Sequence, residues 1–146
     1  VLRRQRQMCI RDRHECTGDE VWLEKASNLM ERQADLFLDE TGGGFYFTSD
    51  DHESLLARAK NPVDNVVPSG NSISALNPIY LGEKLDRPEW LDLAETTIRS
   101  ASTLRQQSPS AVPRMLIASE RYLEVRPERT GQPLEVEPKE PGSPNP

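Results

Sequence analysis

The sequence predicts an all-α fold of about four helices with a short aromatic β-hairpin arm. Apolar residues recur at spacings of three and four in four separate segments, which is the period of an amphipathic helix. Between the first two of these segments, three glycines precede the aromatic run 45–48, whose residues favour extended structure. Together these observations predict helices that pack through one apolar face each, with one extended arm between them.

The first helix is predicted over residues 19–39. Its apolar face comprises Trp22, Ala26, Leu29, Met30, Gln33 and Phe37. Asp19 has the side chain of an N-cap, and Glu20 follows it at the positive end of the helix dipole. The helix is expected to stop at Thr41, before the glycines.

The chain after this helix is expected to be an ordered loop, and its glycines are not those of a phosphate-binding loop. Gly42, Gly43 and Gly44 form no GxGxxG pattern, and no Lys-Ser/Thr pair follows them, so this is not a phosphate loop. Residues 49–68 are mostly polar, and a connection of this length is usually functional or disordered. Alternating charges and the apolar pair Val66-Val67 favour an ordered loop.

Three further helices are predicted over residues 69–85, 88–107 and 111–123. Ser69 or Asn71 is the expected N-cap of the first of these, and Asp86 that of the next. Pro78 lies inside the first and is expected to kink or interrupt it. Because the connections are short, neighbouring helices should be antiparallel. The helix over 69–85 needs packing partners on more than one side.

Both ends of the chain are predicted to lie outside the folded part. Residues 1–13 are expected to be an artefact or disordered, since the segment QMCIRDR resembles translated sequencing-adapter read-through. The alternatives are a solvated basic arm and a nucleic-acid-binding tail. Residues 125–146 are expected to be a disordered proline-rich tail. Six prolines fall there: Pro127, Pro133, Pro138, Pro141, Pro144 and Pro146.

Composition argues against several classes of partner. The net charge of −6 disfavours nucleic acid, which needs a clustered basic face. Cys9 and Cys16 form no CxxC pair and are too few for a zinc site, so we expect neither a metal nor a cofactor. No apolar stretch approaches the ~18 residues of a membrane span. We therefore expect a cytoplasmic protein without a membrane or nucleic-acid partner, and leave its oligomeric state open.

Residues 37–81 carry a resemblance to a known family. They read FLDETGGGFYFTSDDHESLLARAKNPVDNVVPSGNSISALNPIYL, which resembles the signature of the thioredoxin domain-containing/spermatogenesis-associated protein 20 family. The segment 65–67 and Pro78 depart from that signature. The resemblance implies a thioredoxin-like domain followed by an (α/α)6 barrel, similar to six-hairpin glycosidases and N-acylglucosamine 2-epimerases. Residues 14–124 would then form part of the barrel, as a partial (α/α)6 toroid fragment.

This resemblance implies carbohydrate binding or processing in the intact parent protein. A sugar site needs aromatic faces together with carboxylates and amides, and the family segment supplies these side chains. The candidate substrate-binding residues are Tyr46, Asp51, Glu53, Arg58, Lys60, Asp64, Ser69 and Asn71. The structural alternative is a salt-bridged loop in which Ser69 caps a helix and Asp64 braces the loop. At the level of function, the alternatives are a non-catalytic scaffold and a helical interaction module.

No catalytic residue can be assigned from the sequence. Asp51 with Glu53, or Asp50 with Asp64, would form a glycosidase pair only if the carboxyl groups lay about 5–10 Å apart. His52 is the candidate base for an epimerase, and its acidic neighbours favour an exposed position instead. Whether the protein is an enzyme is left open, and a carbohydrate or small-molecule ligand is expected.

Overall fold

The fold is known from a computed structural model that describes the backbone of residues 2–50 and 58–131, and the side chains in those ranges from Ile10 onward. The described residues form six α-helices and two 3-10 turns, and they contain no β-strand. They are α1 (Leu2–Thr17), α2 (Glu20–Phe37), α3 (Gly70–Leu85), α4 (Pro88–Ser100), α5 (Ser102–Gln107), η1 (Pro109–Ala111), α6 (Pro113–Val125) and η2 (Pro127–Arg129). The prediction of a helical fold is confirmed.

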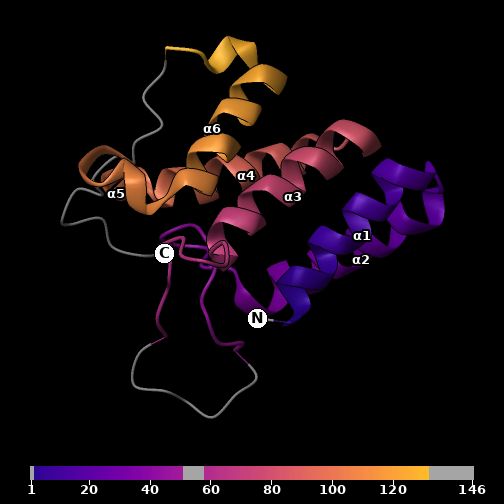
Figure 1. Cartoon of the computed structure of the whole chain (residues 1–146), viewed down its shortest axis with the longest axis horizontal. Coiled ribbons are helices and arrows are strands. Elements are labelled where there is room, and N and C mark those ends of the chain that lie inside the picture. The colour runs from indigo at the N-terminus through magenta and orange to yellow at the C-terminus, as the bar shows by residue number, and fades with distance from the viewer. Residues whose placement is uncertain (1, 51–57, 132–146) are drawn as a thin grey trace, which may run out of the picture.

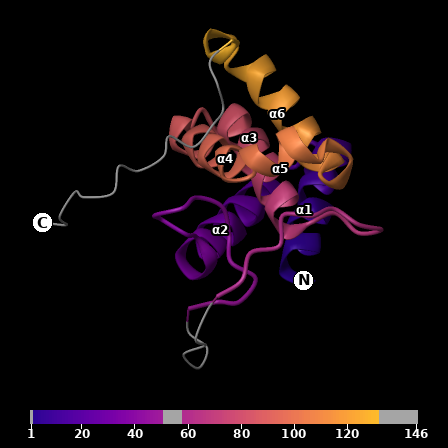
Figure 2. The ribbon, with the colours of Figure 1, turned by 90° about the vertical axis from the view of Figure 1, so that its left-hand side faces the viewer.

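The first four helices form two helical hairpins. Helices α1 and α2 pack together as one hairpin, and α3 and α4 as the other, each joined by a two-residue turn (Figure 1). Gly18 takes a φ of 68° in the first turn, and Asp86 takes a φ of 52° in the second. Helix α6 packs against α3 and α4, and the view from the side shows it rising away from α2 (Figure 2).

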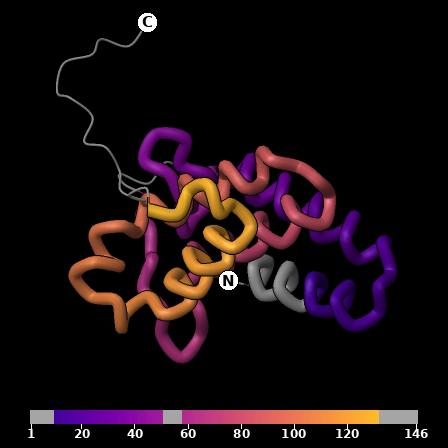
Figure 3. Tube along the Cα trace, turned by 90° about the horizontal axis from the view of Figure 1, so that it is seen from above, coloured from indigo at the N-terminus to yellow at the C-terminus, as the bar shows by residue number. Residues whose placement is uncertain are grey.

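Helix α3 lies between two apolar cores. Ile79 belongs to the core shared with α4 and α6, while Leu81 belongs to the core shared with α2. Both side chains are 1% exposed. Seen from above, α3 has the first hairpin on one side and α6 on the other (Figure 3). As predicted, this helix has packing partners on more than one side.

The N-terminal segment differs from its prediction. Residues 2–13 are part of α1, and not a disordered arm. Leu, Arg, Gln and Met all have high helix propensity, so the helix needs no regular apolar stripe to form. It packs against α2 and α3 through residues such as Ile10. The adapter origin of the segment stays a prediction.

The later helices also differ in detail from the predicted ranges. The helix predicted over 88–107 is divided at Ala101 into α4 and α5, and Asp86 ends α3 where an N-cap of α4 was expected. Arg87 takes that N-cap position. Pro78 does not interrupt α3, because burial on both sides offsets the hydrogen bond that proline removes. Residues 127–129 form η2 inside the segment predicted to be disordered.

The aromatic arm is reduced to a single bridge. Leu38 and Phe45 form an isolated antiparallel β-bridge, and the described part of the chain extends this pairing no further into a strand. None of the described helices is long and apolar enough to cross a membrane.

Candidate functional site

The polar chain between α2 and α3, together with the first turn of α3, is the candidate site, because it holds all the residues that the sequence selected. Asp51 and Glu53, together with His52, lie outside the described residues. The other six candidates are described. They fall into three groups, around Asp39, around Phe45 and at the start of α3.

Asp39 organises the first turn after α2. One carboxylate oxygen, Oδ1, accepts hydrogen bonds from the backbone N–H of Thr41 and of Gly42, each at 3.0 Å, and from the Thr41 hydroxyl at 2.8 Å. The other oxygen pairs with Lys60 Nζ at 2.5 Å. Burial opposes ionisation of Asp39, but the Lys60 hydrogen bond and those from Gly42 and Thr41 outweigh it and hold the pKa well below its ordinary value.

Lys60 also fixes the glycine turn. Its Nζ donates a hydrogen bond to the carbonyl oxygen of Gly43 at 2.6 Å. A Cβ on Gly43 would lie 2.7 Å from the Thr96 carbonyl oxygen, and one on Gly44 would lie 2.7 Å from Ser100 Oγ. Both glycines have positive φ. The glycines are therefore required by close packing of the turn against α4, as well as by backbone conformation.

Asn71 binds the backbone of Phe45 at two points. Its Oδ1 accepts from the Phe45 N–H at 2.7 Å, and its Nδ2 donates to the Phe45 carbonyl oxygen at 3.0 Å. Asn71 is 3% exposed and Phe45 is fully buried. The Asn71 amide thus supplies the donor and the acceptor that a neighbouring β-strand would supply in a sheet. Without it, the buried N–H and carbonyl oxygen of Phe45 would lack hydrogen-bond partners on that side.

Arg58 links the part of the loop that leads to α3 with the C-terminal end of α2. Its Nη2 donates to the carbonyl oxygens of Leu36, at 3.0 Å, and Thr48, at 2.6 Å. A cation at the C-terminal end of a helix also interacts favourably with the helix dipole. The guanidinium carbon lies 4.2 Å from the centre of the Tyr46 ring. A hydrogen bond to Asp39 is the main cause that raises the pKa of the Tyr46 hydroxyl.

Asp64 joins the starts of two helices. Its Oδ1 accepts from the Ser69 N–H at 2.7 Å, and its Oδ2 accepts from the Arg114 N–H, in the first turn of α6, at 2.8 Å. The Asp64 N–H donates to the Ala111 carbonyl oxygen at 2.8 Å. Ser69 is the N-cap of α3, as predicted, with its Oγ accepting from the Ser72 N–H at 3.0 Å.

An open groove lies beside the first group. It has a volume of about 680 Å³. The side chains along it are Ala34, Asp35, Leu38, Asp39, Glu40, Thr41, Tyr46 and Asp50. It contains Asp50 but not Asp64, which is bound to α6, so the structure does not place the two as a pair along one groove. No group of three His, Cys, Asp or Glu side chains suited to a metal ion occurs in the described ranges.

Sequence reasoning missed two residues that organise this region and its surroundings. Asp39 stands two residues before Thr41 and three before Gly42, which is the spacing of a turn closed by an aspartate side chain, and that pattern could have identified it. Glu95, on α4, is 7% exposed and receives hydrogen bonds from the Tyr122 hydroxyl and, at 2.7 Å, from Arg99. Its i,i+4 spacing to Arg99 was the available signal.

Comparison with known proteins supports the resemblance seen in residues 37–81. The chain is 34% identical over 109 residues to human spermatogenesis-associated protein 20, and 34% identical over 107 residues to the mouse protein. The chain is a homologue of spermatogenesis-associated protein 20. The rat protein matches equally, at 34% over 109 residues.

The homology covers a small part of those relatives. The aligned segment is 73% of this chain but 14% of the human protein, and 13% of the mouse protein. No family model matches the chain, and no solved structure matches it. The barrel and the thioredoxin-like domain that the resemblance implied therefore stay predictions.

Proposed function

We propose that the chain is a helical-hairpin segment of an (α/α)-barrel domain in a longer protein, and that its polar loop fastens this segment instead of catalysing a reaction. One observation carries the proposal. Five described candidates from the sequence bind the chain's own backbone: Arg58, Lys60, Asp64, Ser69 and Asn71. These hydrogen bonds hold the loop in place, and they occupy polar atoms that a ligand would otherwise need.

The arrangement of the helices supports a toroidal setting. Helices α1 and α2 form one hairpin and α3 and α4 the next, and α3 contacts both helices of the first hairpin (Figure 1). Repeated helical hairpins placed side by side are the unit from which an (α/α) toroid is built. The relatives are several times longer than the segment they share with this chain, which supports a larger assembly around it.

The fastening role can be tested at Asn71. Asn71→Ala removes both hydrogen bonds to the buried Phe45 peptide group, and should lower stability by about 2 kcal/mol. We expect a fall of roughly 5–10 °C in the thermal midpoint measured by circular dichroism. Asn28→Ala, at an exposed position on α2, is the matched control and should leave the midpoint unchanged. An unchanged midpoint for Asn71→Ala would contradict the fastening role.

The groove beside Tyr46 supports a second function, carbohydrate binding. Tyr46 offers an aromatic side chain, and Asp35, Glu40 and Asp50 offer carboxylates along the same groove, which suits the hydroxyls of a sugar. A sugar that binds here should raise the thermal midpoint by mass action, and Asp50→Asn should reduce that rise. Glu120→Gln, at an exposed position on α6, is the control. No rise with any mono- or disaccharide of a broad panel would count against this function.

A further inference from the structure

A second groove, separate from the polar loop, lies between α1, α3 and α6. Its volume is about 680 Å³, which is within the range of small-molecule sites. Leu76 and Tyr80 of α3 and Ile117 of α6 form its apolar part. Ile117 is 46% exposed, so a large aliphatic side chain faces solvent there. Covering an apolar surface of this kind with a ligand lowers the free energy, because apolar area is removed from water.

Four lysine and arginine side chains line this groove, and they differ in whether a carboxylate neutralises them. Two of the cations already have two carboxylate partners each. Arg121 pairs with Glu83 at 2.7 Å and with Glu124 at 2.8 Å, and Arg11 pairs with Asp12 at 2.9 Å and lies 3.8 Å from Glu15. Two further cations also line the groove. These two cations are the ones that can bind an anion, because a charged donor without a carboxylate partner forms a strong hydrogen bond to a negatively charged group.

The two remaining cations are Lys84 and Arg114. Both are exposed, and neither forms an ion pair with any residue that the structure describes. Lys84 Nζ lies 5.9 Å from the centre of the Tyr80 ring. The backbone N–H of Arg114 donates a hydrogen bond to Asp64, which fixes the position of the Arg114 backbone. The Arg114 guanidinium has no carboxylate partner within the described ranges. Their donors are available to a ligand.

Tyr80 is held in place by a contact from α1. Its hydroxyl lies 2.6 Å from His14 Nδ1, and the two rings meet edge to face at 75°. Fixing the phenol at its polar end leaves the ring as a stable wall of the groove. A flat apolar wall next to a cation suits a ligand that is both apolar and negatively charged.

We propose that this groove binds a small organic anion, with its carboxylate or phosphate on Lys84 and Arg114 and its apolar body against Tyr80 and Ile117. Arg and Lys both donate to such groups, and the hydrogen bonds are strengthened by charge. None of the polar-loop residues that brace α2 and α3 contacts the ligand in this proposal. The proposal is therefore independent of the proposed function and can fail or succeed separately.

The test is a titration of the full chain with phenyl phosphate, phenol and inorganic phosphate, followed by calorimetry. Phenyl phosphate should bind more tightly than either of the other two, because only it carries both the charge and the ring. Its affinity should fall as salt is added, since exposed charges are screened. The double variant Lys84→Gln, Arg114→Gln should bind it at least about tenfold more weakly.

Two further variants keep the result interpretable. Lys25→Gln is the matched control, because Lys25 is also an exposed lysine over an aromatic ring, with its Nζ 4.7 Å from the centre of Trp22. It should leave the affinity unchanged. Ile117→Ser should weaken phenyl phosphate and leave inorganic phosphate unaffected.

Three results would overturn the proposal. Equal binding of phenol would show that charge plays no part, and equal binding of inorganic phosphate would indicate an adventitious ion only. Unchanged affinity in the double variant, with a circular dichroism spectrum like that of the wild type, would place the ligand elsewhere.

Discussion

Single polar side chains hold the chain between α2 and α3, where a sheet would otherwise supply backbone partners. Asp39 closes the turn at one carboxylate oxygen and binds Lys60 with the other. Asn71 supplies both a donor and an acceptor to Phe45. Because each of these groups is buried or half-buried, loss of its partner would leave an unsatisfied polar atom, which is costlier than loss of an exposed contact.

The ion pair of Asp39 predicts a dependence of stability on pH. Its pKa is lowered in the folded protein from the ordinary value of 3.8, so its contribution is present above that value and is lost as the pH falls below it. Asp39→Asn keeps an acceptor for the turn and removes the charge. We expect the variant to be about 2 kcal/mol less stable than the wild type near neutral pH, with the difference shrinking in acid.

Urea unfolding at several pH values measures this difference. Glu40→Gln is the control, because it changes the neighbouring carboxylate, which is exposed. It should be as stable as the wild type throughout. If the gap between Asp39→Asn and the wild type were the same in acid as at neutral pH, the ion pair with Lys60 would not be its source.

At the scale of elements, the sequence predicts what is local. The N-caps Asp19 and Ser69 were identifiable because each bonds an N–H only two or three residues away. The break between α4 and α5 was not, since the apolar stripe continues through it. There the Ser100 hydroxyl bonds back to the Thr97 carbonyl and the Ala101 N–H bonds to Ile98, which tightens the turn without changing the side-chain pattern.

The candidate site illustrates the same limit. The sequence selected Arg58 and Asn71 by residue type, and both bind the backbone of the chain that leaves α2. Their partners are the backbone of Leu36 and of Phe45, 22 and 26 residues away. Spacing along the chain does not reveal such contacts, because they depend on how the loop folds back onto α2 and α3. Residue types suited to a sugar are equally suited to bracing a backbone.

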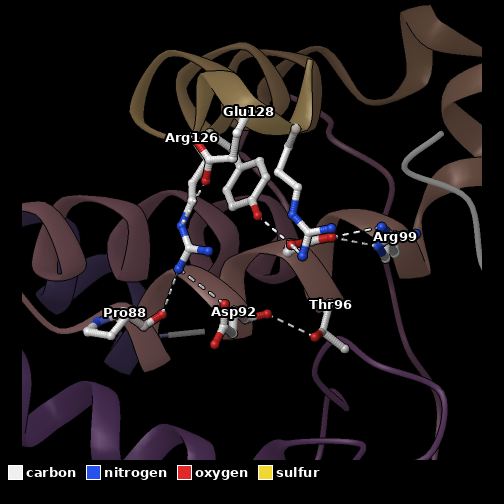
Figure 4. Close-up of polar contacts among 9 residues, drawn as sticks. Pro88, Asp92, Thr96, Arg99, Arg126 and Glu128 are labelled. Atoms are coloured by element: carbon white, nitrogen blue, oxygen red, sulfur yellow. Dashed lines mark hydrogen bonds and ion pairs between the residues drawn. The ribbon is translucent and has the colours of Figure 1, made fainter. Parts of the chain in front are cut away.

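At the scale of the whole molecule, a buried ionic cluster joins the C-terminal part to α4. Glu95 of α4 binds Arg99, receives the Tyr122 hydroxyl of α6, and lies 3.3 Å from Arg129 of η2. Alongside it, Arg126 binds Asp92 at 3.2 Å (Figure 4). Three elements therefore depend on one carboxylate, and α6 in turn carries part of the core with α3.

This cluster predicts a loss of stability in alkali. Burial, and then the hydrogen bond to Glu95, raise the pKa of Tyr122 to about 12, from an ordinary value of 10.0. A raised pKa gives stability that is present below pH 10 and is lost as the pH rises to 12, because the unfolded chain ionises first. The wild type should lose about 2–3 kcal/mol relative to Tyr122→Phe over that interval. Glu95→Gln should lose less, since the carboxylate that opposes the phenolate is gone. Denaturant unfolding followed by circular dichroism gives these differences. If the difference in free energy of unfolding between the wild type and Tyr122→Phe stayed constant across the interval, the hydroxyl would not link α6 to α4 in this way.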